Sequence, residues 1–71
     1  MLREIIVTLK KIRAEKKVTH EELSRRAGIS QKHISSIENY KTKPSIETLE
    51  KLAKGLGTEL NFEISAKASG E

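Results

Sequence analysis

Several residue types that commonly stabilise small proteins or build reactive sites are missing or rare in this chain of 71 residues. It has no cysteine and no tryptophan, one proline, one tyrosine and one phenylalanine. Without cysteine, the chain can form neither a disulfide framework nor a thiolate metal site. Its two histidines, His20 and His33, are too few to hold a zinc ion by themselves. The sequence therefore predicts no metal and no cofactor.

Long apolar runs are missing too. No segment approaches the roughly 20 apolar residues that a membrane-spanning helix needs. The first residues also lack the small-residue cleavage site of a secretory signal. We expect a cytoplasmic protein with no membrane partner. The length is enough for one domain with one small core, which packing and hydrogen bonds alone must hold together.

The charge of the chain is basic and unevenly distributed. The whole sequence has 14 basic and 10 acidic residues, a net charge of +4. Residues 1–58 hold 13 basic and 7 acidic residues, net +6, whereas residues 59–71 hold one basic and three acidic residues, net −2. A basic body is typical of proteins with a polyanionic partner such as nucleic acid. Mild basicity is also common in small soluble domains, so charge alone does not decide the function.

Four helices are predicted from periodicity and from helix-start signals. Apolar residues recur at three- and four-residue steps from Leu2 to Ile12, which indicates a helix over 2–16. Three further helices are expected over 20–27, 31–39 and 46–56, each preceded by a hydroxyl residue that suits the N-cap: Thr19, Ser30 and Ser45. Residues on either side of each cap have the spacing of a hydrophobic staple: Val18 with Leu23, Ile29 with Ile34, and Pro44 with Leu49. Gly28 and Gly57 suit the ends of the second and fourth helices.

The segment after residue 57 has a different pattern. Leu60, Phe62 and Ile64 alternate with polar residues, which predicts a half-buried strand over 58–65. A lone strand cannot satisfy its backbone, so this strand would pair with that of a second copy in an antiparallel two-stranded sheet. A short fifth helix and a loose tail are the alternatives. The expected organisation is a domain over 1–57, a dimerising strand over 58–65 and a flexible tail over 66–71.

The second and third helices, with a glycine-containing turn between them, make a helix-turn-helix. On a helical wheel Ile34 and Ile37 point to the core, and so does Glu38, the one acid of the segment. The outward residues are small or form hydrogen bonds, and none is a carboxylate: Lys32, Ser35, Ser36 and Asn39, with Gln31 and His33 at the flanks. A helix that enters the major groove of DNA needs such a surface.

From about residue 5 to 57 the sequence resembles the DNA-binding domain of Cro/repressor-type helix-turn-helix regulators, the xenobiotic-response-element family. The matching residues are Arg13, THEEL at 19–23, AGIS at 27–30, Gln31, Ile34, Ile37–Asn39 and PSIETLEKLAKGLG at 44–57. The resemblance implies an all-α four-helix domain whose third helix reads a double-stranded DNA operator. It also implies a homodimer on two half-sites about one helical turn apart.

The resemblance implies a role for individual residues. Gln31, Lys32 and Ser36 match positions that read base edges, and His20, Asn39, Lys41 and Lys43 match positions at or near phosphates. Arg13 and Glu38 match an ion pair that ties the first helix to the end of the third. The chemistry of the residues adds that the start of the second helix, at Thr19 and His20, offers free amides to phosphate, and that Ser35 reads bases weakly. Ser30, the cap of the third helix, is a further candidate for DNA contact. His33 has no assigned role.

Two positions depart from the family pattern. Ser24 stands where alanine is usual, and Tyr40 stands where glycine often follows Glu-Asn. If the site of Tyr40 needs a positive φ, tyrosine costs about 1 kcal/mol or more there. Asn39 is the alternative residue for that conformation.

The alternatives to a DNA-binding repressor are an enzyme, an antitoxin and a protein-interaction module. Ser30, His33 and Glu38 resemble a catalytic triad by residue type, but Ser30 is already used as a cap and no recessed pocket is predicted, so we expect no enzyme. The alternating segment is similar to that of HipB-type antitoxin repressors, which makes a toxin protein a possible partner. A protein-interaction module without DNA binding would favour acids on the outer face of the third helix, and none is there.

Overall fold

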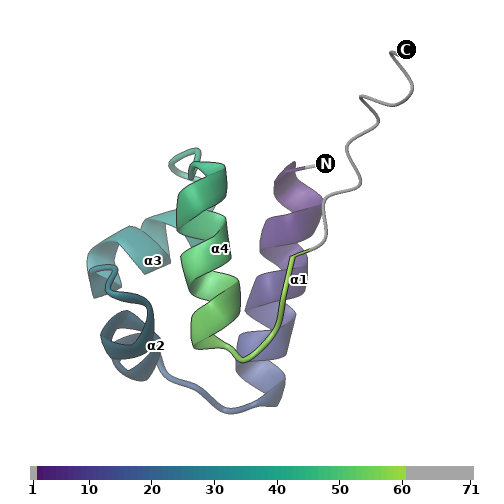
Figure 1. Ribbon diagram of the computed structural model, residues 1–71. Helices are drawn as coiled ribbons and strands as arrows, with labels where there is room; N and C mark the ends of the chain where they lie inside the picture. The colour runs from purple at the N-terminus through teal and green to yellow at the C-terminus, as the bar shows by residue number, and fades with distance from the viewer. Residues whose placement is uncertain (1, 61–71) are drawn as a thin grey trace.

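The computed structural model describes residues 2–60, and these form four helices: α1 (Leu2–Glu15), α2 (His20–Ala27), α3 (Gln31–Glu38) and α4 (Ile46–Gly55). In the view of Figure 1, α2 and α3 lie on one side of α4 and α1 lies on the other. The observed bounds agree with the predicted ones to within one residue at each end of every helix. The prediction of a four-helix, all-α domain is confirmed for this part of the chain.

All three predicted N-caps are present. The hydroxyl oxygens of Thr19, Ser30 and Ser45 accept hydrogen bonds from backbone amides three residues on, at 3.0, 3.1 and 3.1 Å. The staple residues around each cap are buried, including Pro44 before α4. The Glu22 carboxylate does not return a hydrogen bond to the α2 cap, because it binds Arg25 and Arg26 one turn ahead. Glu22 has the spacing from Thr19 that a reciprocal capping box needs, but only the hydrogen bond from its backbone amide to the Thr19 hydroxyl is formed. Local sequence signals therefore place the helix starts.

The core is aliphatic and draws on every helix and on the turns between them. Ile34, Ile37, Leu49 and Leu56 are essentially inaccessible to solvent. The other buried apolar residues are Ile6, Leu9, Val18, Leu23, Ile29, Leu52 and Ala53. α2 packs against both α3 and α4, and α1 packs against α3. Ile46, the first residue of α4, is three residues before Leu49 and so has the spacing of the apolar face, but it is 59% exposed.

Each helix is followed, within two residues of its last one, by a residue with left-handed backbone geometry. Gly28 and Gly57 have φ of 72° and 75°, but Lys17 and Tyr40 have φ of 56° and 61° in the same role. After α3, the amide of Lys41 donates to the carbonyl of Ser36 at 2.8 Å, which closes a Schellman motif around Tyr40. Tyr40 thus takes the strained conformation, and Asn39, at φ −96°, does not. Tyrosine and lysine each cost about 1–2 kcal/mol relative to an unstrained backbone.

The predicted dimerising strand falls mostly outside the described residues. Residues 58–60 have no regular secondary structure, and Leu60 is half-buried against the core of its own chain. Phe62 and Ile64 lie outside the described residues, so strand pairing over 58–65 stays a prediction. Within residues 2–60, no helix combines the length and apolarity needed to cross a membrane.

Candidate nucleic-acid interface

The outer face of α3 is polar and carries no exposed carboxylate. Burial of Ile34 and Ile37 fixes the rotation of this short helix, since both side chains are at least 99% buried. The same rotation leaves Gln31, Lys32 and His33 exposed and Ser35 and Ser36 half-buried. The wheel assignment of the predicted base-reading residues to one outward surface is therefore consistent with the packing. All of them come from the first two turns of α3.

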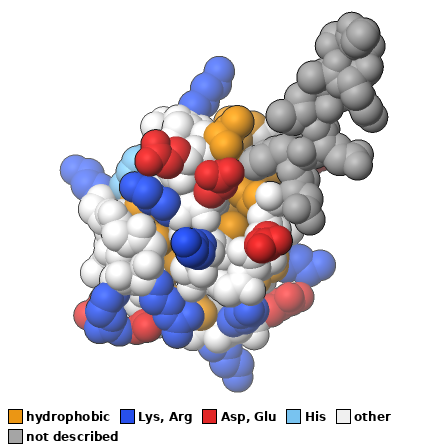
Figure 2. Space-filling view, in the orientation of Figure 1, with side chains coloured by type: hydrophobic (Ala, Val, Ile, Leu, Met, Phe, Trp, Pro, Cys, Tyr) orange, Lys and Arg blue, Asp and Glu red, His pale blue; other side chains and the backbone are white. Residues whose placement is uncertain are grey.

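The exposed side of α4 has a different character. Figure 2 looks onto the side of α4, where carboxylates and basic side chains are mixed. The exposed residues of α4 include Glu47, Glu50, Lys51 and Lys54. A surface of mixed sign offers no advantage to a polyanion, whereas the surface of α3 offers a cation and hydrogen-bonding groups without an opposing acid. The distribution of acids therefore favours α3 as the nucleic-acid side.

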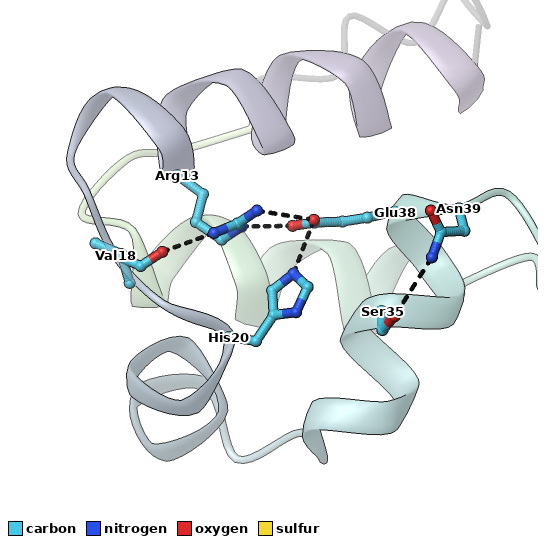
Figure 3. Close-up of polar contacts among 6 residues, drawn as sticks. All are labelled: Arg13, Val18, His20, Ser35, Glu38 and Asn39. Carbon is cyan, nitrogen blue, oxygen red and sulfur yellow. Dashed lines mark hydrogen bonds and ion pairs between the residues drawn. The ribbon is translucent and has the colours of Figure 1, made fainter.

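Glu38 is kept off the α3 surface by an ion pair with α1 (Figure 3). The guanidinium of Arg13 donates from Nε to Oε2 at 2.7 Å and from Nη2 to Oε1 at 3.1 Å, a two-pronged geometry. Its remaining nitrogen, Nη1, donates to the carbonyl oxygen of Val18 at 2.8 Å. The predicted pairing of Arg13 with Glu38 is present in the structure. It joins the last turn of α1, the turn that follows it and the end of α3.

The environment of Glu38 determines its charge. Burial by itself raises the pKa of this carboxyl, but hydrogen bonds and positive charge from Arg13 and His20 outweigh burial and hold the pKa below its usual range. The group is therefore ionised at neutral pH. A buried carboxylate is stable here because two donors from other helices satisfy it.

His20 occupies a place that the sequence did not indicate. Its Nε2 lies 2.9 Å from Oε1 of Glu38, so the first residue of α2 joins the Arg13–Glu38 pair (Figure 3). About a third of the His20 side chain remains exposed. The resemblance placed this residue at a phosphate, and no local pattern links residues 20 and 38. Only the packing of α2 against α3 reveals that contact.

Thr19 and Ser30 are exposed residues at the starts of α2 and α3. Their hydroxyl oxygens act as caps, which leaves each hydroxyl hydrogen available to donate. Both predicted contact residues are thus accessible, and both also stabilise the helix that they begin.

The turn between α3 and α4 presents two lysines. Lys41 and Lys43 are exposed, and among residues 2–60 neither they nor Lys32 form an ion pair. Asn39 is exposed as well, and its amide nitrogen donates to the hydroxyl of Ser35 at 3.3 Å. The Arg3 guanidinium lies 4.4 Å from the centre of the Tyr40 ring, a cation–π contact that ties this turn to α1. Sequence reasoning missed that contact, because residues 3 and 40 share no local pattern.

Comparison with known proteins agrees with this geometry. The family model described as helix-turn-helix matches residues 9–62, which include α2, α3 and the turn between them. The chain belongs to the helix-turn-helix family. The predicted resemblance to Cro/repressor-type regulators is confirmed at this level.

Two curated relatives of the helix-turn-helix chain share part of its sequence. It is 43% identical over 47 residues to an uncharacterized HTH-type transcriptional regulator, y4dJ, of Sinorhizobium fredii (strain NBRC 101917 / NGR234), an alignment that covers 66% of the chain and 61% of the relative. It is 36% identical over 53 residues to the immunity repressor protein of Bacillus phage phi105, covering 75% of the chain and 37% of the relative. The alignments thus span less than two thirds of either relative. No solved structure matches the chain significantly.

Proposed function

We propose that this helix-turn-helix protein is a transcriptional repressor that binds a double-stranded DNA operator with α3 in the major groove. The observation that carries the proposal is the outer face of α3, which is polar, includes an unpaired lysine and has its one acid withdrawn into the core by Arg13. A glutamine at the start of such a helix suits an adenine edge, and lysine suits guanine. Gln31, Lys32 and Ser36 are the proposed base-reading residues, with Ser35 as a weaker contact.

The proposed backbone contacts surround this reading surface. Thr19, His20 and Ser30 lie at the starts of α2 and α3, and Asn39, Lys41 and Lys43 lie at and beyond the end of α3. Phosphate contacts from two sides would fix the register of the helix in the groove without reading sequence. The protein would act as a binding protein and not as an enzyme.

We further propose that the repressor is a homodimer. A single reading helix of eight residues contacts few bases, and two half-sites about one helical turn apart are the usual solution in this class of regulators. Pairing of residues 58–65 between two copies is the proposed dimer contact. A variant that ends at residue 58 should then sediment as a monomer, whereas an unchanged dimer would refute the strand as the dimer element.

Selection of bound duplexes from a random pool tests the main proposal. The expected result is a sequence preference with dyad symmetry and a half-site spacing near 10 base pairs, since about 10–10.5 base pairs make one turn. Recovery of duplexes without any common sequence would contradict sequence-specific binding. Binding to the selected duplex should weaken steeply with salt, because cationic side chains release counterions from phosphates.

A pair of substitutions separates base reading from phosphate binding. Gln31→Ala should relax the preference at one base position in each half-site, at a cost of about 1–3 kcal/mol on the preferred sequence. Lys43→Ala should weaken all duplexes about equally and lower the salt slope by about one per contact. Lys51→Ala, an exposed lysine on the mixed face of α4, is the matched control and should change neither property. An unaltered base preference in Gln31→Ala would show that the reading surface is assigned incorrectly.

The antitoxin alternative concerns a toxin protein as a second partner. No observation on residues 2–60 favours it over the repressor, and the alternating segment that motivated it extends beyond those residues. Both functions include DNA binding, so the selection experiment does not separate them. Rescue of growth on co-expression with a toxin encoded beside the chain's own gene would support the alternative.

A further inference from the structure

The two ring nitrogens of His20 have different surroundings. Nε2 lies 2.9 Å from the Glu38 carboxylate, whereas Nδ1 has no hydrogen-bond partner among the described residues. Figure 3 shows Nδ1 directed away from Glu38. The side chain is about one-third exposed. A ligand in solution can therefore reach the ring while Nε2 stays bound to the carboxylate.

The carboxylate determines which nitrogen carries the hydrogen. An ionised carboxylate only accepts hydrogen bonds, so the nitrogen that faces Glu38 has to be the donor. Glu38 is ionised at neutral pH because Arg13 donates to both of its oxygens. A neutral His20 ring thus has its hydrogen on Nε2 and a lone pair on Nδ1. A second donor at Nδ1 exists only when the ring is doubly protonated.

DNA phosphates are acceptors as well, and they cannot form a hydrogen bond with a lone pair on Nδ1. Turning the ring to offer Nε2 to a phosphate would give up the bond to Glu38. We propose that His20 binds a DNA phosphate through a protonated Nδ1 while Nε2 remains on Glu38, so that operator binding takes up one proton at each His20. This rests on the proposed function, since it assumes that α2 begins at the DNA backbone.

The charges around the ring come from three helices. Glu38 of α3 contacts it directly, and Arg13 of α1 binds the same carboxylate. On α2 itself, Glu21 is the next residue, and Glu22 is paired with Arg25 and Arg26. Among the described residues, α4 contributes neither an ion pair nor a hydrogen bond to this cluster. A phosphate would thus add its negative charge on the side of the ring opposite Glu38, and an imidazolium between two anions is favoured over a neutral ring.

Proton uptake is measurable by calorimetry with the selected duplex in buffers of different ionisation enthalpy. Binding by the wild-type protein should be accompanied by net proton uptake. The affinity for the duplex should fall as pH rises, by up to about tenfold per pH unit for each His20 that takes up a proton. His20→Gln should remove the uptake, because an amide donates without titrating. His33→Gln, which changes the other histidine of the chain, should retain it, because the inference places the uptake at His20 alone.

Nitrogen-15 spectra of the wild-type imidazoles give a second readout that needs no variant. The free protein should show His20 with its hydrogen on Nε2, and the complex should show both nitrogens protonated. A hydrogen on Nδ1 in the free neutral ring, or duplex binding with no proton uptake, would overturn the inference and leave the proposed function standing. Uptake that persists in His20→Gln would overturn it too. If no duplex is bound at all, the proposed function fails and the inference fails with it.

Discussion

Removing either partner of the Arg13–Glu38 ion pair should destabilise the fold strongly. The two side chains are 18% and 11% exposed, and they share two hydrogen bonds, at 2.7 and 3.1 Å. Breaking a fully buried pair by removing one partner costs about 3–5 kcal/mol. Because some solvent reaches this pair, we expect about 2–3 kcal/mol for Arg13→Met, which leaves the Glu38 carboxylate with His20 as its remaining side-chain donor. Glu38→Met should cost about as much, since Arg13 keeps only the Val18 carbonyl.

The double variant distinguishes the interaction from the cost of the individual side chains. With both charges replaced by methionine, no uncompensated charge remains, so the loss should be close to that of one single variant and not to the sum of two. The coupling energy of the cycle should then be about 2 kcal/mol, within the range measured for residues in contact. Arg25→Met, which breaks the exposed pair with Glu22, is the control and should cost no more than about 0.5 kcal/mol.

Urea unfolding followed by circular dichroism is the appropriate assay. Domains of this size often have only about 3–5 kcal/mol of stability, so each single variant should be compared with wild type in the same concentration of a stabilising osmolyte. The dependence of the free energy of unfolding on urea should stay unchanged, since all variants expose similar surface. A coupling energy below about 0.5 kcal/mol would refute the assignment of this pair as the link that holds α3 to α1.

Three further predictions concern acid stability and backbone geometry. The pKa of Glu38 is lower in the folded chain than its ordinary value of 4.5, so its contribution to the free energy of unfolding is complete above pH 4.5 and is lost as pH falls through the folded pKa. In acid titrations, the free energy of unfolding of Glu38→Gln should therefore fall less steeply with pH than that of the wild type. Equal slopes would contradict this. Lys17→Gly should raise the free energy of unfolding by up to about 1 kcal/mol, since glycine relieves the positive φ, and a destabilised variant would show that Lys17 is not strained. Gly55→Val should lower the free energy of unfolding by about 1–3 kcal/mol in thermal unfolding, because a Cβ at residue 55 would lie 3.0 Å from Leu23. The control Lys54→Val, on the exposed side of α4, should cost under about 1 kcal/mol. Equal losses in the two variants would show that the close contact with Leu23 is not limiting.

The helix starts illustrate what a local pattern can predict. Thr19, Ser30 and Ser45 each need only an amide three residues ahead, and that distance is set by helix geometry alone. The same holds for the rotation of α3, since Ile34 and Ile37 are the only large apolar residues of that helix and have to face the core. Both predictions were confirmed because each depends on a pattern of residues that are close together in the chain.

The candidate site was predictable only in part. Spacing and polarity selected the outer face of α3, and the family resemblance supplied the pairing of Arg13 with Glu38, which residues 25 apart do not indicate by themselves. Neither source indicated that His20 reaches Glu38 or that Arg3 covers Tyr40. These contacts depend on the angles at which α1, α2 and α3 cross, and no short-range rule sets those angles.

The sequence by itself determined four helices, their starts, an aliphatic core and an outer face of α3 without exposed acids, because each of these follows from periodicity or from hydrogen bonds within a few residues. The tertiary structure decided where charge and strain reside. It placed the positive φ on Tyr40 and not on Asn39, left Ile46 in solvent, and assembled one carboxylate with donors from two other helices. A buried charge has to be satisfied by whatever donor the packing brings within about 3 Å, and only the folded chain determines which donor that is.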